Sequence, residues 1–270
     1  MIDIKDFSKT FNPGTNNEVK ALVDISLKIN EGDFLTIIGT NGSGKSTLLN
    51  AVAGSFIGDK GKIIIDDNDV TSMPDFKRAK WISRVFQNPY LGTAPNMTIA
   101  ENLHLSMNRG KRHLPLKRLN DLRRQQLTEL LKELEMQLET RLDNIIGSLS
   151  GGQRQAITLL MSIANQPKVL LLDEHTAALD PKSATQIIKL TEMFIKRSNL
   201  TAIMVTHSMQ QALALGNRTI MMYKGEIVEE LSIQDKKNLT VDDLLEKFAQ
   251  IRKREMLNSE LINDFRKEYF

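Results

Sequence analysis

The chain has 270 residues, 41% of them apolar, and a formal net charge of +3, values that are typical of a globular protein and exclude disorder or a fibrous repeat. No run approaches the roughly 18 consecutive apolar residues of a transmembrane helix, and the charge is too small to bind nucleic acid through a general electrostatic field. The absence of cysteine excludes disulfides, thiolate metal ligands and cysteine nucleophiles. Asp3 and Asp6 stand where a secretory signal would be basic, so we expect a cytosolic protein.

The N-terminal part of the chain predicts an antiparallel sheet followed by a strand, a loop and a helix. Apolar and polar side chains alternate at residues 2–4 and 22–29, and the turn-rich segment 12–17 lies between them. Residues 34–38 form an apolar run that leads into a glycine-rich turn, and residues 46–53 then have helical spacing. This order is typical of a strand–loop–helix unit.

After a further predicted strand at residues 62–65, segment 96–148 changes to a helical pattern. Its leucines recur every three or four residues, at Leu116, Leu119, Leu122, Leu127, Leu130, Leu131, Leu134 and Leu138. Residues 169–172 and 202–205 are apolar runs typical of strands buried on both faces of a parallel sheet, with a helical stretch at 181–196 between them. We therefore predict an α/β fold with a mixed, largely parallel sheet, an N-terminal antiparallel β subdomain and an inserted helical subdomain.

The end of the chain predicts a hairpin over residues 219–228, turning at Lys224 and Gly225, and then an amphipathic tail over residues 241–270. The tail is too short for an ordinary regulatory domain, and we expect a dimer-stabilising helix. One basic stretch also stands out: Arg109, Lys111, Arg112, Lys117, Arg118, Arg123 and Arg124 are accompanied by a single acid, Asp121. A solvated helical face and a surface for anionic lipid both remain open for it.

A nucleotide-binding loop follows the predicted strand at residues 34–38 and opens the next helix, as the motif G-x4-G-K-[ST] requires. Its residues are Gly39, Thr40, Asn41, Gly42, Ser43, Gly44, Lys45, Ser46 and Thr47. Backbone N–H groups of such a loop turn inward on an anion, Lys45 reaches the terminal phosphates, and the Ser46 hydroxyl can bind Mg²⁺. Loop, lysine, hydroxyl and context together disfavour the alternative of a glycine-rich turn with a surface lysine. A P-loop NTPase core is expected.

Two carboxylates, Asp173 and Glu174, end the apolar run at residues 169–172, at the carboxyl end of a strand where α/β sheets bind ligands. Asp173 is the candidate ligand of Mg²⁺, and Glu174 is the candidate residue that orients or deprotonates the attacking water. The alternative for the pair is a solvated acidic turn after a strand.

A second anion site is predicted at Ser150, which precedes a helical apolar pattern over residues 156–164 and is followed by Gly151 and Gly152. A helix N-terminus with bare glycine backbone suits a phosphate. One chain with two anion sites and a single lysine-bearing loop suggests that two copies meet. Each copy would present its serine and glycines to the nucleotide held by the other.

The segment Leu-Ser-Gly-Gly-Gln-Arg-Gln at residues 149–155, which includes Gln153 and lies about 20 residues before Asp173, resembles the signature of ABC ATPases. The resemblance covers roughly residues 1–230 and implies ATP and Mg²⁺ as cofactors. It also implies four further site residues: Phe11 as the aromatic that stacks on adenine, Gln87 as a link between γ-phosphate, Mg²⁺ and the helical insertion, Asp180 in the D-loop, and His207 as the γ-phosphate contact. Phe11 has an alternative place in the core.

This resemblance implies an ABC ATPase domain over residues 1–240, with the helical subdomain inserted at about 90–160 and the tail at 241–270. The implied partners are a second copy of the chain, a membrane permease contacted by residues 88–105 and, indirectly, a substrate-binding protein, with no nucleic acid. The implied location is the cytoplasmic face of the membrane. His175 departs from the small residue expected after Glu174 and is expected to be structural.

The direction of transport and the cargo are inferred from weaker signals. Residues 141–148 lack the Glu-Arg-Gly stretch whose presence would resemble many exporters. Its absence favours an importer. Segments 92–97 and 173–180 are similar to a bacterial subgroup that accompanies amino-acid-type permeases, so an amino acid is expected, with aromatic ones as an option. An exporter subunit and a non-transport ABC ATPase of DNA repair or translation remain as alternatives. The latter is disfavoured because there is one nucleotide loop and no long heptad insertion.

Overall fold

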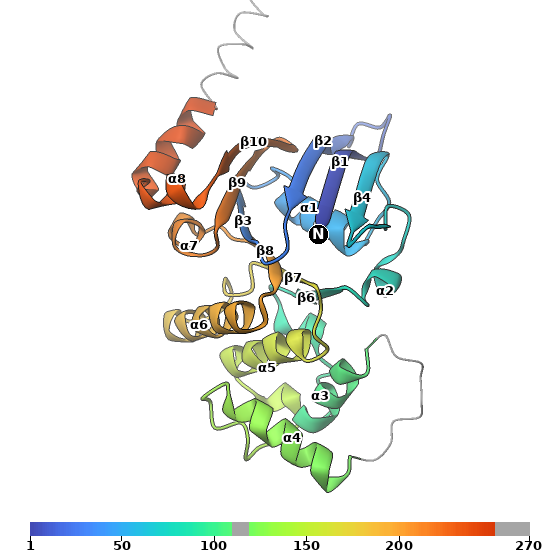
Figure 1. Ribbon diagram of the computed structural model, residues 1–270, viewed down its shortest axis with the longest axis vertical. Helices are drawn as coiled ribbons and strands as arrows, with labels where there is room; N and C mark the ends of the chain where they lie inside the picture. The colour runs from blue at the N-terminus through green and yellow to red at the C-terminus, as the bar shows by residue number, and fades with distance from the viewer. Residues whose placement is uncertain (110–118, 252–270) are drawn as a thin grey trace, which may run out of the picture.

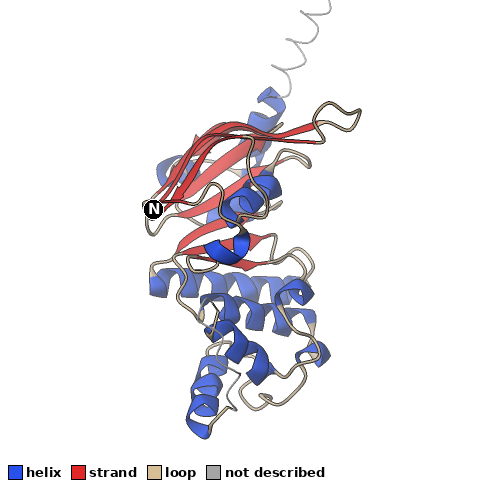
Figure 2. Cartoon of the chain, turned by 90° about the vertical axis from the view of Figure 1, so that its right-hand side faces the viewer, coloured by secondary structure: helices blue, strands red, loops and turns tan. Residues whose placement is uncertain are grey.

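The computed structural model describes residues 1–109 and 119–251, in which strands gather at one end of the molecule and a group of helices forms the other end (Figures 1 and 2). The strands are β1 (Ile2–Phe11), β2 (Val19–Ile29), β3 (Phe34–Gly39), β4 (Lys60–Ile65), β5 (Asn68–Asp69), β6 (Ile82–Val85), β7 (Val169–Asp173), β8 (Thr201–Val205), β9 (Arg218–Tyr223) and β10 (Glu226–Leu231). The helices are α1 (Lys45–Ala53), α2 (Asp75–Arg78), α3 (Ile99–Met107), α4 (Asp121–Lys132), α5 (Gly151–Ile163), α6 (Pro181–Ser198), α7 (Met209–Ala214) and α8 (Ile233–Lys237), with short 3₁₀ turns at Pro89–Gly92 and Ile146–Ser148.

The predicted N-terminal antiparallel sheet is confirmed: within the described ranges it has four strands in the order β2-β1-β4-β5. β1 is much longer than the alternation at residues 2–4 indicates. Its pairing with β2 shifts register between Ile4 and Phe7 and again between Phe7 and Lys9, and Asp6 has a φ of 47°. Because bulges of this kind interrupt the two-residue period, the pattern alone could not follow the strand to Phe11.

The described residues also form a six-stranded sheet in the order β10-β9-β3-β8-β7-β6. Its neighbours from β9 to β6 are parallel, and β10 joins the edge through the predicted antiparallel hairpin. The prediction of a mixed, largely parallel sheet is therefore confirmed.

The two faces of this sheet are covered by different layers, which explains its continuous apolar strands. Along β7, Val169 and Leu171 belong to a core shared with α1 and the antiparallel sheet, so α1 lies between the two sheets. Leu170 and Leu172 belong instead to a core shared with α3, α4, α5 and α6. All four side chains are fully buried.

The predicted helical insertion contains α3 and α4 and packs on α5 (Figure 1). Leu127, Leu131, Leu134 and Leu138 are fully buried, but Leu122 is 65% exposed. The prediction that Leu122 belongs to the apolar repeat was wrong. Leu122 lies five residues before Leu127, and a spacing of five places the two side chains on different faces of a helix. Leu116 lies outside the described residues. Among residues 1–109 and 119–251, no helix combines the length and apolarity that crossing a bilayer requires.

The basic stretch divides between described and undescribed residues. Arg109 donates hydrogen bonds to the carbonyls of Ala79 and Ile82, and Arg124 pairs with Asp143 at 2.5 Å. Lys111, Arg112, Lys117 and Arg118 lie outside the described residues. Arg123 Nη1 donates to Gln126 Oε1 on the same helix at 3.1 Å. The three described arginines therefore make contacts within the fold.

The beginning of the predicted tail is helical over residues 241–251, and residues 252–270 lie outside the described part of the chain. Leu244 and Phe248 are buried in a small core with Ile38, Met221 and Leu231. The tail therefore starts as a helix packed on the part of the six-stranded sheet that β3, β9 and β10 form.

Candidate nucleotide-binding site

Four loops that carry predicted site residues leave neighbouring parallel strands at the same edge of the sheet. The glycine-rich loop follows β3, His207 follows β8, Asp173 and Glu174 end β7, and Gln87 follows β6. Loops at the carboxyl ends of adjacent parallel strands converge. Residues up to 168 positions apart in the chain thus share one edge.

The glycine-rich loop is shaped to receive an anion. Gly42 and Gly44 have φ values of 76° and 99°, and a Cβ on Gly44 would lie 2.5 Å from the carbonyl of Ala21. The Lys45 ammonium folds back over the loop and donates hydrogen bonds to the carbonyls of Gly39 and Thr40 at 2.9 and 3.0 Å. Burial lowers the pKa of Lys45, and the negative charge of Glu174 partly offsets this.

One buried polar atom in this loop fits a phosphate particularly well. The Ser43 hydroxyl is buried and has no hydrogen-bond partner among the described residues. A buried hydroxyl without a partner costs free energy, which a bound oxyanion would recover. Ser46 and Thr47 follow in the first turn of α1, where Ser46 is exposed. The exposed Asn41 lies in the loop itself.

Glu174 and His207 form a pair at the centre of the edge. The Glu174 carboxylate lies 2.6 Å from His207 Nε2, and the Glu174 N–H donates to the carbonyl of Val205 at 3.0 Å. Glu174 has a φ of 45°, which a residue with a side chain seldom adopts. The structure thus brings together the two residues predicted for water activation and γ-phosphate contact. Gln87 is exposed in its loop.

Sequence reasoning missed Arg84, which holds Asp173. Arg84 Nη2 donates to Asp173 Oδ2 at 2.6 Å, and Nη1 donates to Asn50 Oδ1 at 2.6 Å. No motif of the sequence includes Arg84, so none could have indicated this contact.

The predicted second anion site has the expected cap. Ser150 is the N-cap of α5, with its hydroxyl accepting from the N–H of Gln153 and the Gln153 side chain accepting from the N–H of Ser150. Ser150 and Gly151 are exposed. Gly152 is buried, and a Cβ there would lie 2.6 Å from the Ser183 hydroxyl. Gly152 is therefore required by the packing of α5 on α6 as well.

Asp180 and Phe11 lie at the borders of the site. Asp180 caps α6 by accepting from the N–H of Ser183 at 3.0 Å. Phe11 ends β1 with 36% of its surface exposed, and its ring packs edge-on against Phe56 at 5.4 Å. The alternative that Phe11 is a core residue is wrong, and its ring is accessible to a base.

Comparison with known proteins identifies the family. The family model described as ABC transporter matches residues 22–177. A tyrosine transport ATP-binding protein of Clostridioides difficile is 45% identical over 249 residues, which are 92% of this chain and 98% of that protein. The chain belongs to the ABC transporter family. The predictions of an ATPase, and of a subunit that drives transport, are confirmed.

Other relatives of this ABC ATPase agree with its fold. A spermidine/putrescine import ATP-binding protein of Haemophilus influenzae is 36% identical over 231 residues, 85% of this chain and 57% of that protein. A dimeric ATP-binding cassette bound to ADP and phosphate is 31% identical, with a TM-score of 0.73 over 86% of this chain and 99% of the other. An ADP-bound cassette of an ABC transporter is 26% identical, with a TM-score of 0.74 over 92% and 98%. The predicted P-loop NTPase fold is confirmed, and the ABC ATPase binds ATP.

His175 of the ABC ATPase does not belong to the site at the sheet edge. Its side chain is fully buried, and Nε2 lies 3.1 Å from the hydroxyl of Thr191 on α6. Burial lowers the pKa of His175 to about 4, so the imidazole is neutral at physiological pH. The residue that follows Glu174 therefore anchors the end of β7 to α6.

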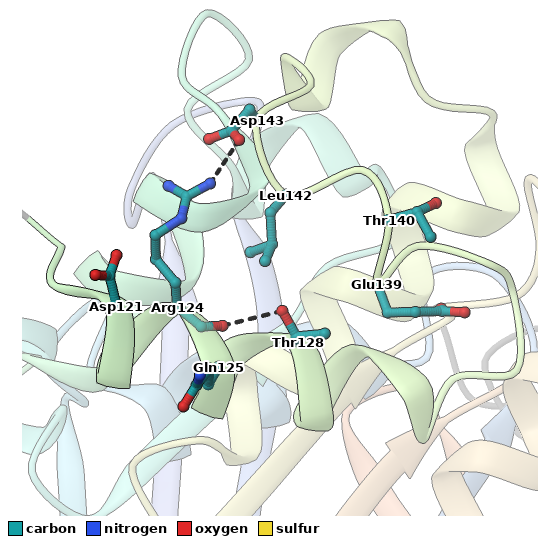
Figure 3. Close-up of a pocket in the computed structure, with 8 residues that line it drawn as sticks. All are labelled: Asp121, Arg124, Gln125, Thr128, Glu139, Thr140, Leu142 and Asp143. Atoms are coloured by element: carbon teal, nitrogen blue, oxygen red, sulfur yellow. Dashed lines mark hydrogen bonds and ion pairs between the residues drawn. The ribbon is translucent and has the colours of Figure 1, made fainter.

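A pocket of about 460 Å³ lies in the helical subdomain (Figure 3). Asp121, Arg124, Glu139 and Asp143 are among its lining residues, and Arg124 points at Asp143 across it. Because none of the motif residues lines this pocket, we place the functional site at the sheet edge.

Proposed function

We propose that this ABC ATPase powers the import of an amino acid, with tyrosine as the first cargo to test. The observation that carries the proposal is the 45% identity to a tyrosine transport ATP-binding protein, which extends over nearly the full length of both chains. An amino acid cargo, aromatic ones included, was also expected from the segments around residues 92–97 and 173–180.

Within each copy, the nucleotide would be held by residues of the sheet edge. Lys45 would release its bonds to the loop carbonyls and turn to the β- and γ-phosphates, while Ser43 and the loop N–H groups supply further donors. Phe11 would stack on the adenine, because its ring is accessible at the end of β1.

A magnesium ion fits the donors present at this edge. Ser46, Gln87 and Asp173 offer a hydroxyl, an amide oxygen and a carboxylate, and oxygen atoms are the ligands that Mg²⁺ prefers. When bound, the ion supplies positive charge that neutralises the β- and γ-phosphates. Glu174 would orient and deprotonate the attacking water, and His207 would hold Glu174 in place and contact the γ-phosphate.

The signature helix would act on the nucleotide of a second copy. The capped N-terminus of α5, with exposed Ser150 and Gly151, can bind phosphate and lies at the helical end of the chain, whereas Lys45 begins α1 between the sheets (Figure 1). A dimeric cassette among the related structures supports this arrangement. Gln153 and Asp180 would lie at the same interface.

Closure of the dimer would be passed to membrane helices through the loop after Gln87 and residues 88–105. Tyr90 and Leu91 are 55% and 69% exposed there, which suits contact with a permease. The ABC ATPase would then lie on the cytoplasmic face of the membrane, with a substrate-binding protein as an indirect partner. The domain limits at residues 240 and 241 stay predictions.

The test is reconstitution of the ABC ATPase with its membrane permease in vesicles, with candidate cargoes delivered by the substrate-binding protein. We expect tyrosine to stimulate ATP hydrolysis and to accumulate in the direction of import. Lys45→Ala should abolish both effects. Stimulation by spermidine without any response to amino acids, or movement of cargo in the export direction, would contradict the proposal.

A further inference from the structure

Arg84 occupies an unusual position beside the proposed magnesium ligand. It lies on β6 between the buried residues Ser83 and Val85, and its side chain is only 17% exposed. The guanidinium reaches Asp173 on β7 and Asn50 on α1, each at 2.6 Å. Its Cζ also lies 4.7 Å from the centre of the Phe86 ring, directly before Gln87. One side chain therefore connects three elements that border the nucleotide site.

We propose that Arg84 is a positioning residue that neutralises Asp173 in the absence of metal and thereby sets how tightly the site takes Mg²⁺. The inference rests on the proposed role of Asp173 as a magnesium ligand. The guanidinium is a cation whose fork of donors matches a carboxylate, and it places positive charge 2.6 Å from Asp173.

The physical reason is competition between two cations for one carboxylate. Asp173 is 16% exposed, so solvent screens the pair with Arg84 only in part. An ion that binds Asp173 has to share the carboxylate with the guanidinium or displace it. The contact thus stabilises the metal-free protein and raises the metal concentration that the site needs.

The remaining contacts of Arg84 allow such sharing. Nε is buried and has no hydrogen-bond partner among residues 1–109 and 119–251, so the guanidinium has a spare donor. Asn50 follows Lys45 by five residues on α1, and its bond to Nη1 anchors the arginine when Asp173 turns away. The arginine can therefore keep one firm contact while its bond to Asp173 changes.

The main experiment compares the wild-type protein with Arg84→Gln, which removes the charge but keeps a polar side chain. Mg²⁺ is titrated into each protein in the presence of a fluorescent ADP, and thermal unfolding is recorded without nucleotide in excess EDTA. We expect the magnesium midpoint of Arg84→Gln to fall on the order of tenfold, within the range typical of coupled sites. Its unfolding midpoint should fall by about 3 °C because Asp173 loses its counter-ion.

Two control variants test the charge and its location. Arg84→Lys keeps the charge, so its magnesium midpoint should stay near that of the wild-type protein. Arg197→Gln removes a surface arginine that pairs with Glu133 at 2.9 Å, and it should leave the midpoint unchanged. An equal or higher magnesium midpoint for Arg84→Gln would overturn the inference.

Asp173→Asn separates this inference from the proposed function. If Asp173→Asn binds fluorescent ADP with the same magnesium dependence as the wild-type protein, Asp173 is not a ligand, and both the magnesium site proposed above and the role of Arg84 fail. If Asp173→Asn loses that dependence while Arg84→Gln behaves like the wild-type protein, the role of Arg84 alone fails. We expect Asp173→Asn to lose it and Arg84→Gln to show the lower midpoint.

Discussion

Glu174 combines a strained backbone with the chemistry proposed for it. A φ of 45° is costly for a residue with a side chain and persists where surrounding contacts impose it. Here the contacts are the bond from its N–H to Val205 and the pairing of its carboxylate with His207. Both partners lie at or just after the end of β8. We therefore interpret the strain as the cost of turning the Glu174 carboxylate, which follows β7, towards His207.

Glu174→Gln should separate ATP binding from hydrolysis. The amide keeps the size of the side chain but cannot accept a proton, so the hydrolysis rate should fall by about 100-fold or more. ATP-dependent dimers should then accumulate, because closure persists without hydrolysis, and light scattering measures them. Glu135→Gln, at an exposed glutamate that also has a positive φ, should hydrolyse ATP normally. Only monomers at saturating ATP would contradict the expectation.

Residues in short motifs could be predicted from the sequence, whereas residues defined by distant contacts could not. Lys45 lies in a short motif with its own local geometry, which is why its place could be anticipated. Arg84 is 89 positions from Asp173 and 34 from Asn50, and only the fold brings them together. The contact of His175 with the buried Thr191 could not be predicted either, because Thr191 lies on a different element, α6.

At the scale of elements, the start of β3 is fastened to β9 by a small polar cluster. Asp33 accepts a hydrogen bond from Arg218 at 2.6 Å and another from Asn217 at 3.1 Å, and the N–H of Asn30 donates to it. Burial raises the pKa of Asp33, but the bonds from Asn30 and Arg218 outweigh it, so the pKa lies below its ordinary value. The cluster stabilises the strand that leads into the nucleotide-binding loop.

Asp33→Ala should destabilise the protein by about 2 kcal/mol at pH 7, somewhat less than a fully buried ion pair would cost. Because the folded pKa is lowered, the contribution of Asp33 is fully present above an unfolded pKa of about 3.9 and is lost as the pH falls through the folded value. Urea unfolding at pH 7 and below pH 4 measures the difference, which should shrink in acid. Asp143→Ala, at a 72% exposed aspartate that also pairs with an arginine, should cost under about 1 kcal/mol. Equal costs for both variants would argue against the cluster.

The elements themselves were largely predictable, and their pairing was less so. Apolar runs such as 169–172 indicated buried strands because both faces of the sheet are covered. The hairpin of β9 and β10 was visible because its turn is local. The parallel pairing of β9 with β3, at Thr219 opposite Thr36, joins segments far apart in the chain, and no local period could indicate it.

At the scale of the whole molecule, the two predicted anion sites lie in different parts of one chain. Lys45 and Glu174 belong to the sheet edge, whereas Ser150 opens a helix that packs with the helical subdomain (Figure 1). Two copies that face each other would bring the two anion sites together, because each copy would place its Ser150 helix N-terminus at the Lys45 loop of the other. The central claim is therefore that a complete site requires residues of two chains.

Mixing two inactive variants tests that claim most directly. Lys45→Ala removes the phosphate lysine and Ser150→Arg blocks the helix N-terminus, so each protein alone should hydrolyse almost no ATP. Random pairing in an equal mixture gives heterodimers with one intact site, so about a quarter of the wild-type rate should return. If the mixture stays inactive although both variants are folded and form dimers, or if Ser150→Arg alone keeps the full rate, the shared-site account is contradicted.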